Sequence, residues 1–235
     1  MSKKKLKYNK ILLKISGELL GQNHEVLTPR ILEYIAAQII TVKKLGVKIA
    51  VVMGGGNIVR GKEVSWLDKV DADHCGMLST IINGIALYSV LKRKISDVFL
   101  RSSFEIPGLV RGFQKTEDRI LYEQGGILLL AGGTGNPLFT TDTAAALRAV
   151  ELSAQLLIKG TKVEGVYSAD PEKDKNARLY RRLSFQEAID KNLKVMDLTA
   201  FGICKDARIP ICVYNLTRYP LEKIVLGEEI GTLVF

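Results

Sequence analysis

A lysine inside an apolar segment near the amino terminus is the first residue whose type and position point to chemistry. Lys14 lies between Leu13 and Ile15 in a short apolar run that ends at Ser16-Gly17. A charge buried without a partner costs far more free energy than a fold can spare, so an ammonium group in a buried strand needs an anion. A lysine that faces solvent from the strand is the alternative, and its apolar neighbours argue against it. We therefore expect Lys14 to meet an anion.

Three glycine-rich turns follow apolar segments and could bind phosphate. They are Ser16-Gly17, residues 54–57 (GGGN) and residues 132–136 (GGTGN). Glycine lets backbone N–H groups approach phosphate oxygens, and a following helix adds its positive amino end. One such turn is commonly turn geometry alone, but three in one chain favour phosphate binding. None matches the P-loop or the G-x-G-x-x-G dinucleotide pattern.

Two further charged residues lie close to these turns. Arg60 follows the second turn by a few residues, and Asp142 follows the third. For Arg60, an exposed loop position explains the spacing equally well. The turns and their charged neighbours therefore predict a site for phosphate anions, formed where several strands end.

The elements that would position these residues alternate along the chain. Strands are expected at 11–15, 47–53, 97–100, 127–130, 155–159, 211–215 and 232–235, and helices at 29–45, 77–92, 116–124, 143–153 and 198–207. Thr28 and Asp197 are expected to cap helices, and Ser184 with Glu187 predicts a capping box on another short one. Uniformly apolar strands between helices indicate an α/β fold, with a mainly parallel sheet covered by helices on both faces. We expect one continuous domain, residues 1–235.

Composition excludes several classes of protein. Apolar residues make up 47% and charged residues 25% of 235, which is typical of a globular chain, and no apolar run is long enough for a membrane span. The apolar run after the lysine-rich first ten residues is too short for a signal peptide. Three cysteines without metal-ligand spacing indicate reduced thiols in a cytoplasmic protein. Five of the net +9 charges belong to lysines at positions 3–10, so a solvated tail explains the charge better than nucleic-acid binding.

Motifs at and beyond the glycine-rich turns extend over essentially the whole chain. They occupy residues 14–18 (KISGE), 54–61 (GGGNIVRG), 73–78 (DHCGML), 133–142 (GTGNPLFTTD), 161–167 (TKVEGVY), 169–171 (ADP) and 194–197 (KVMD). In combination they resemble the bacterial uridylate (UMP) kinase family of the amino acid kinase superfamily. The resemblance implies a three-layer αβα sandwich that transfers the γ-phosphate of ATP to UMP, in de novo pyrimidine nucleotide synthesis.

The resemblance also implies roles for individual residues. Lys14, Arg60, Asp142 and Asp197 would be catalytic, with the two aspartates organising the catalytic lysine and Mg²⁺, which enters with ATP; the metal ligands stay unidentified. The ATP side would be lined by Lys14, Ile15, Ser16, Gly17, Gly56, Arg60, Thr161, Tyr167 and Asp170. UMP would be bound by Gly55, Asp73, Thr134, Gly135, Asn136, Pro137, Leu138, Phe139, Thr140 and Thr141. The amino-terminal part would thus bind mainly UMP and the carboxyl-terminal part mainly ATP.

The same resemblance implies a homohexamer, built as a trimer of dimers, that UTP can inhibit. It leaves the response to GTP open, because residues 21–27 and 62–71 depart from the family pattern. The acceptor phosphate is mostly dianionic at pH 7 and needs no general base, which agrees with the lack of a Ser-His-Asp arrangement. The only tryptophan, Trp66, is expected to be a packing residue.

Three alternatives remain open from the sequence. A related kinase could phosphorylate a carboxylate or carbamate, although residues 136–141 and the motif at Asp73 argue against it. A nucleic-acid or nucleotide-sensing protein could use the basic tail. Asp73 could select ribose by accepting hydrogen bonds from its hydroxyls, or it could cap a helix that starts near Met77.

Overall fold

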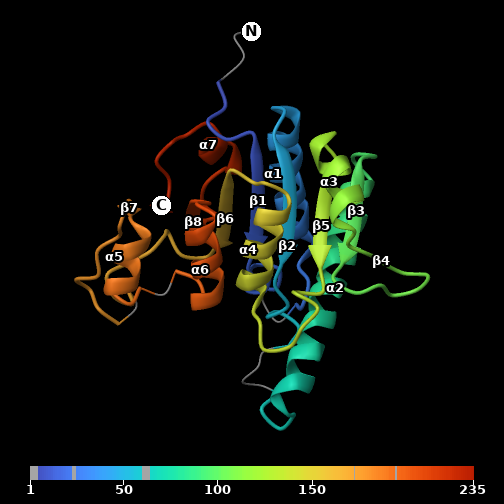
Figure 1. Ribbon diagram of the computed structural model, residues 1–235, viewed down its shortest axis with the longest axis horizontal. Coiled ribbons are helices and arrows are strands. Elements are labelled where there is room, and N and C mark those ends of the chain that lie inside the picture. The colour runs from blue at the N-terminus through green and yellow to red at the C-terminus, as the bar shows by residue number, and fades with distance from the viewer. Residues whose placement is uncertain (1–4, 23–24, 60–63, 172, 194) are drawn as a thin grey trace.

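The computed structural model describes residues 5–22, 25–59, 64–171, 173–193 and 195–235, and their strands form one mainly parallel sheet. Its order is β4-β3-β5-β2-β1-β6-β8-β9-β7 (Figure 1), and in the part of the chain described only β9 runs antiparallel to its neighbour β8. The strands are β1 (Lys10–Ile15), β2 (Lys48–Met53), β3 (Val98–Ser102), β4 (Arg111–Gly112), β5 (Ile127–Ala131), β6 (Leu156–Thr161), β7 (Arg182–Leu183), β8 (Ile211–Asn215) and β9 (Thr232–Val234).

Helices cover both faces of this sheet. They are α1 (Pro29–Lys44), α2 (Lys69–Lys92), α3 (Lys115–Glu123), α4 (Thr141–Glu151), α5 (Phe185–Asp190), α6 (Leu198–Asp206) and α7 (Leu221–Val225), with a 3₁₀ turn at Gly17–Leu19. Apolar side chains of α1, α2 and α7 pack on one face, and those of α3, α4, α5 and α6 pack on the other. The expected three-layer αβα sandwich is confirmed, and α2 extends beyond the sheet (Figure 1).

The central strand β1 is buried on both faces, which explains its uninterrupted apolar run. Leu13 and Ile15 belong to the core beneath α1 and α2, whereas Leu12 belongs to the core beneath α4. Because side chains alternate along a strand, Lys14 shares the face of Leu12 and points toward α4. The side chain of Lys14 therefore enters the helix layer that contains Asp142.

Helix α2 begins two turns earlier than the sequence predicted. It starts at Lys69, where the carboxylate of Asp68 accepts the N–H groups of Val70 and Asp71 at 2.7 and 3.1 Å. The prediction of a start near Met77 was wrong because the first two turns are mostly polar and contain a glycine, so they lack an apolar period. Asp73 consequently lies inside the helix, and the interpretation of Asp73 as its cap is wrong.

Other helix starts agree more closely with the sequence. The capping box of Ser184 and Glu187 is present at α5, and Asp197 caps α6. Thr28 occupies the cap position of α1, but its Oγ1 accepts the N–H of Gln22 instead of a helix N–H. Helix α4 begins at Thr141, two residues before the expected start, so Asp142 lies in its first turn.

Three remaining expectations concern exposure and membranes. Trp66 is 79% exposed, so it does not pack within this chain, and that expectation was wrong. Cys75, Cys204 and Cys212 are all free thiols. Among the described helices, α2 alone is long and apolar enough to span a membrane, but half of its most apolar window is buried in this chain, which is typical of a core helix.

Candidate functional site

The first two glycine-rich turns touch each other at the carboxyl ends of β1 and β2. A Cβ atom added to Gly17 would lie 2.5 Å from the backbone nitrogen of Gly56 and 2.9 Å from the carbonyl oxygen of Gly54. Real Cβ atoms do not approach backbone so closely, so only glycine allows this contact. The two turns therefore form one unit directly after Lys14.

Helix α2 supports both the second and the third turn. A Cβ atom on Gly55 would lie 2.7 Å from the carbonyl oxygen of Gly76 in α2. On the other side, the Oγ1 of Thr80 accepts the N–H of Gly132 at 2.7 Å, at the start of the turn that follows β5. That turn uses glycines with positive φ at 132, 133 and 135. One helix thus fixes the spacing between two candidate phosphate-binding turns.

A cavity of about 370 Å³ lies between these turns and α2. Six of the residues expected to bind UMP line it, namely Gly55, Asp73, Leu138, Phe139, Thr140 and Thr141. The other four, residues 134–137, lie in the same loop but do not line the cavity. Polar atoms and apolar side chains such as Met77 share its wall, a combination suited to a small polar ligand with a flat ring.

The loop over this cavity is held in a strained conformation by Asp73. Leu138 has a φ of 71°, which is unusual for a residue with a side chain, and its N–H donates to Oδ2 of Asp73 at 2.7 Å. Strain of this kind persists only where surrounding contacts fix it, and it gathers at ligand sites. Asp73 therefore has a structural contact in addition to any contact with a ligand.

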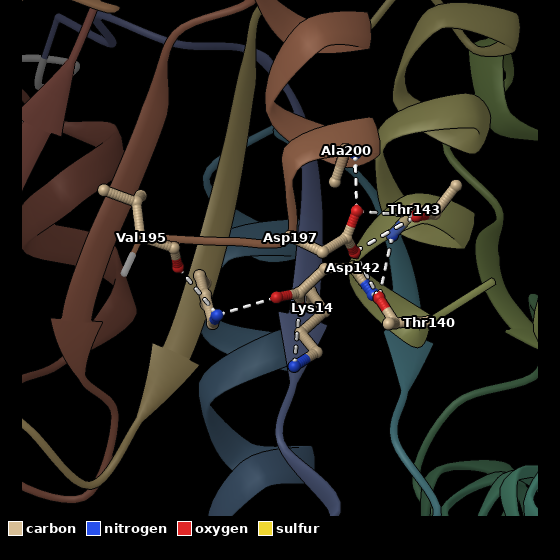
Figure 2. A network of polar contacts seen from close by, with 8 residues as sticks. Lys14, Thr140, Asp142, Thr143, Val195, Asp197 and Ala200 are labelled. Atoms are coloured by element: carbon tan, nitrogen blue, oxygen red, sulfur yellow. Dashed lines mark hydrogen bonds and ion pairs between the residues drawn. The ribbon is translucent and has the colours of Figure 1, made fainter. Parts of the chain in front are cut away.

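Lys14, Asp142 and Lys159 form a buried cluster on the α4 side of the sheet. The Nζ of Lys14 lies 2.8 Å from Oδ1 of Asp142, and the Nζ of Lys159 donates to Oδ2 of Asp142 at 2.7 Å. The three side chains are only 10–17% exposed. Figure 2 shows Lys14 and Asp142 pointing toward each other, with Thr140 and Asp197 close by. Two ammonium groups facing one carboxylate leave the cluster with net positive charge.

Burial and charge compete at Asp142. Burial opposes its ionisation, but the charges of Lys14 and Lys159 outweigh it, so the pKa of the carboxyl lies below its ordinary value. At Lys159 burial has the larger effect, so the pKa of its ammonium lies below the ordinary value although the Asp142 carboxylate raises it. Asp142 is thus ionised at neutral pH, with its oxygens already paired.

Asp197 joins the amino ends of two helices next to this cluster. It accepts the N–H of Ala200 at 2.9 Å as the cap of α6, and it accepts the hydroxyl of Thr143 at 3.0 Å from α4. The hydroxyl of Thr140, which caps α4, also donates to it. These contacts bring both positive helix ends to the same place (Figure 2). The structure thus brings Asp197 near Asp142, but it pairs only Asp142 with Lys14.

Lys159 is the residue that sequence reasoning missed. It ends the apolar stretch 156–158, the same signal that drew attention to Lys14, and it is the partner of Lys14 in the parallel register of β1 and β6. Its Nζ also donates to the carbonyl oxygen of Val195 at 2.8 Å. Lys159 therefore ties the segment before α6 to Asp142.

A second cavity, of about 460 Å³, is lined by the segment that comes after β6 in the chain. Tyr167 and Asp170, both expected on the ATP side, line it together with part of the segment 163–173 and residues 191–193. The remaining expected ATP residues are elsewhere. Residues 14–17 lie in β1 and its turn, Thr161 ends β6, and Gly56 lines the first cavity. Arg60 lies outside the described residues.

The order of the strands places the charged cluster between the two cavities. The first cavity adjoins the turns after β2 and β5, the second follows β6, and β1 lies between β2 and β6. Lys14 on β1 therefore lies between the two cavities. Two buried ammonium groups between two cavities are suited to stabilising a phosphoryl group that moves from one cavity to the other.

Cys204 lies near this cluster, but its environment disfavours the thiolate that nucleophilic catalysis would need. Burial, followed by the charges of Asp142 and Asp197, raises the pKa of Cys204 to about 12. The thiolate is the reactive form, so this thiol is inert at neutral pH. The cluster can therefore stabilise charge, but it offers no activated sulfur nucleophile.

The residues suit a metal ion that arrives with a nucleotide. The described residues contain no group of three or more His, Cys, Asp and Glu side chains that could hold an ion alone. Mg²⁺ commonly takes one or two carboxylates and completes its octahedron with phosphates and water. Asp142 already faces two ammonium groups, so Asp197 is the better candidate for such a contact.

Comparison with known proteins gives a consistent result. The Amino acid kinase family matches residues 9–215. A curated uridylate kinase of Pseudoalteromonas atlantica is 43% identical over 231 residues, covering 97% of this chain and 94% of that protein. Solved structures of UMP kinases from Bacillus anthracis and Ureaplasma parvum superpose with TM-scores of 0.93 and 0.90. Each is 33% identical over 97% of this chain, and the match covers 96% and 99% of those chains.

Proposed function

This chain belongs to the amino acid kinase family, and we infer that it is a UMP kinase, which transfers the γ-phosphoryl group of ATP to UMP and yields ADP and UDP. The observation that carries this conclusion is the match to UMP kinases over nearly the full length of both partners. The two cavities on either side of a buried positive cluster agree with a reaction between two nucleotides.

The first cavity is proposed as the UMP site. Asp73 would accept hydrogen bonds from the ribose hydroxyls, since a carboxylate accepts but does not donate. Leu138 and Phe139 are 61% and 48% exposed on the loop beside it, so they could cover an apolar base face. The glycine turns at 54–57 and 132–136 would then lie near the acceptor phosphate.

The ATP site is proposed at the second cavity, with the triphosphate reaching toward β1. Tyr167 and Asp170 would contact the nucleoside part. Residues 14–17 and Thr161 would approach the phosphates, because they end β1 and β6 at the edge where the third turn also lies. Arg60 remains a proposed catalytic residue. Residues 1–235 would thus act as one domain, with UMP bound mainly by its amino-terminal part and ATP mainly by its carboxyl-terminal part.

The proposed mechanism is direct in-line transfer without a general base. A phosphate oxygen of UMP attacks the γ-phosphorus while the bond to the β–γ bridging oxygen breaks. UMP is mostly dianionic at pH 7, so no proton must be removed. Lys14 would stabilise the charge on the transferred group, and Asp142 would hold Lys14 in position. Mg²⁺ that enters with ATP would supply further positive charge to the phosphates, and Asp197 would be the carboxylate that holds it.

The wider setting of the enzyme is proposed from the family. We propose a cytoplasmic homohexamer, a trimer of dimers, acting in de novo pyrimidine nucleotide synthesis and inhibited by UTP. Nucleic acid and membranes are not expected as partners. Light scattering tests the hexamer, and the mass of a single chain at working concentration would contradict it.

A substrate panel tests the function itself. Release of ADP from ATP should be measured with UMP, CMP, dUMP, acetylglutamate and carbamate as acceptors. UMP should give the highest kcat/KM by a wide margin. Comparable rates with acetylglutamate or carbamate would instead favour a kinase acting on carboxylates or carbamates.

A further inference from the structure

A pair of asparagines, one completely buried and one partly exposed, joins α2 to the turn that follows β2. Asn83 lies on the inner side of α2 and is completely buried, and Asn57 ends the turn at 54–57. The Nδ2 of Asn83 donates to Oδ1 of Asn57 at 2.7 Å, and the Nδ2 of Asn57 donates to Oδ1 of Asn83 at 3.0 Å. The two amides therefore pair reciprocally, which fixes both their distance and their orientation.

Each amide uses its second N–H group to hold a backbone carbonyl. Asn83 donates to the carbonyl oxygen of Gly54 at 2.7 Å, and Asn57 donates to the carbonyl oxygen of Val26 at 2.7 Å. Both N–H groups and the oxygen of each side chain are thus engaged. Because Asn83 is completely buried, a shift of its amide would leave buried donors or acceptors unpaired, so its position tolerates little displacement.

The turn that Asn83 holds has no side chains of its own to fix its position until Asn57. Its first three residues are glycines, which have the greatest conformational freedom in the chain. Gly55 and Gly56 line the first cavity, and Gly54 touches Gly17 in the turn after β1. Movement of this turn would therefore change the acceptor site and the backbone directly after the catalytic lysine at the same time.

The same pair reaches the segment before α1. A Cβ atom on Gly21 would lie 2.9 Å from the carbonyl oxygen of Val26 and 3.4 Å from Cβ of Asn57. Val26 is therefore joined to Asn57 by a hydrogen bond, and Gly21 packs closely against both residues.

We propose that Asn83 is a positioning residue for phosphoryl transfer: it fixes the Gly54–Asn57 turn against α2 and, through Asn57, ties the segment 25–28 to that turn. The proposal rests on the UMP kinase function inferred above. Asn83 acts through the turn and not by contact with a nucleotide. Its loss should therefore lower kcat/KM for UMP by more than the accompanying loss of fold stability explains.

Two aspartate variants separate the parts of this network. Asn83→Asp keeps the oxygen that Asn57 donates to, but it loses both donated bonds and sets a carboxylate against the carbonyl of Gly54. Asn57→Asp keeps the bond that Asn83 donates to it and leaves the Asn83–Gly54 bond intact, but it loses both bonds that Asn57 donates, to the carbonyl of Val26 and to Oδ1 of Asn83. We expect kcat/KM for UMP to fall about 10- to 100-fold in Asn83→Asp and less than about 10-fold in Asn57→Asp, since small misplacement of reacting groups has effects of this size.

A matched control lies one helical turn away. Leu87→Ala removes a completely buried side chain from α2 but no hydrogen bond to the turn, so it should lower the melting temperature and leave the kinetics unchanged. If Leu87→Ala and Asn83→Asp lost kcat/KM equally at equal loss of stability, Asn83 would be merely structural and the proposal would be overturned. Wild-type kinetics in Asn83→Asp would overturn it as well.

Hydrogen exchange gives a readout that does not depend on turnover. Amides of residues 54–59 should exchange faster in Asn83→Asp, and those of residues 25–28 should exchange faster in both aspartate variants. If wild-type enzyme did not phosphorylate UMP, the inferred function would fail while the exchange data still tested the network. If Asn83→Asp did not fold, Asn57→Asp would decide: unchanged kinetics and unchanged exchange at 25–28 would refute the proposal.

Discussion

Methionine in place of either lysine of the Asp142 cluster should separate turnover from stability. Methionine preserves most of the apolar stem but removes the charge. In Lys14→Met the carboxylate of Asp142 keeps its contact with Lys159 at 2.7 Å, so no unpaired charge remains buried. The loss of stability should therefore stay near 1–2 kcal/mol, below the roughly 3–5 kcal/mol of a fully broken buried pair. Turnover should fall about 10²- to 10³-fold, as for the loss of one preorganised donor.

Lys159→Met should behave differently, although Lys159 and Lys14 lie at similar distances from Asp142, 2.7 and 2.8 Å. Lys159 also donates to the carbonyl oxygen of Val195 at 2.8 Å, and that buried acceptor would lose its partner. The variant should be about 1–3 kcal/mol less stable than Lys14→Met. Its kcat should fall less than that of Lys14→Met, because Lys159 holds Asp142 and the segment before α6, whereas Lys14 is the lysine proposed to meet the transferred group.

The assays are a coupled measurement of ADP release and urea unfolding followed by circular dichroism. KM for UMP should change little in Lys14→Met, because its charge acts on the transferred group and not on bound UMP. Wild-type turnover in Lys14→Met would refute the role of Lys14. So would losses of kcat that simply follow the loss of stability in both variants.

Three further predictions concern the carboxylates and the strained loop. In Asp73→Ala the ratio of kcat/KM for UMP to kcat/KM for dUMP should fall toward one, and an unchanged ratio would reject ribose selection. Asp73→Asn should keep the hydrogen bond from the N–H of Leu138. Because the folded-state pKa of Asp142 is lowered, its ionised form stabilises the fold above the unfolded pKa of about 4, and this stabilisation is lost as the pH falls through the folded-state pKa. The difference in unfolding free energy between wild type and Asp142→Asn should therefore be constant from about pH 8 to 5 and narrow below about pH 4, and narrowing already at pH 6 would contradict the lowered pKa. Leu138→Gly should change the free energy of unfolding by less than about 0.5 kcal/mol, because relief of the positive φ offsets the added freedom of the unfolded chain. KM for UMP should rise several-fold. A large loss of stability would show that the Leu138 side chain mainly packs against the fold and does not mainly cover the site.

The sequence predicted the parts of this fold that follow from local pattern. Apolar strands indicated a parallel sheet covered on both faces, and the lysine among apolar neighbours indicated a buried anion partner for Lys14. Both inferences use only residue type and nearest neighbours, and both are confirmed. The partner itself, Asp142, was among the charged residues that the turns singled out.

Features that depend on tertiary contacts could not be predicted in the same way. Lys159 becomes conspicuous only when the register of β1 and β6 sets it beside Lys14. The early start of α2 was hidden because its first turns project beyond the sheet and carry few apolar residues. The amide pair of Asn57 and Asn83 joins positions 26 residues apart through a turn whose placement no local period describes.

A single turnover in which the phosphoryl group is followed tests direct transfer to UMP. Wild-type enzyme in excess should be mixed with ATP labelled with ³²P in the γ position, together with UMP and Mg²⁺, and quenched over time. In direct transfer, label leaves ATP and enters UDP at the same rate, and the protein never becomes labelled. Lys14→Met should slow this transfer about 10²- to 10³-fold. Label that passes first onto the protein, or that never enters UDP, would contradict direct transfer to UMP at the Lys14–Asp142 cluster.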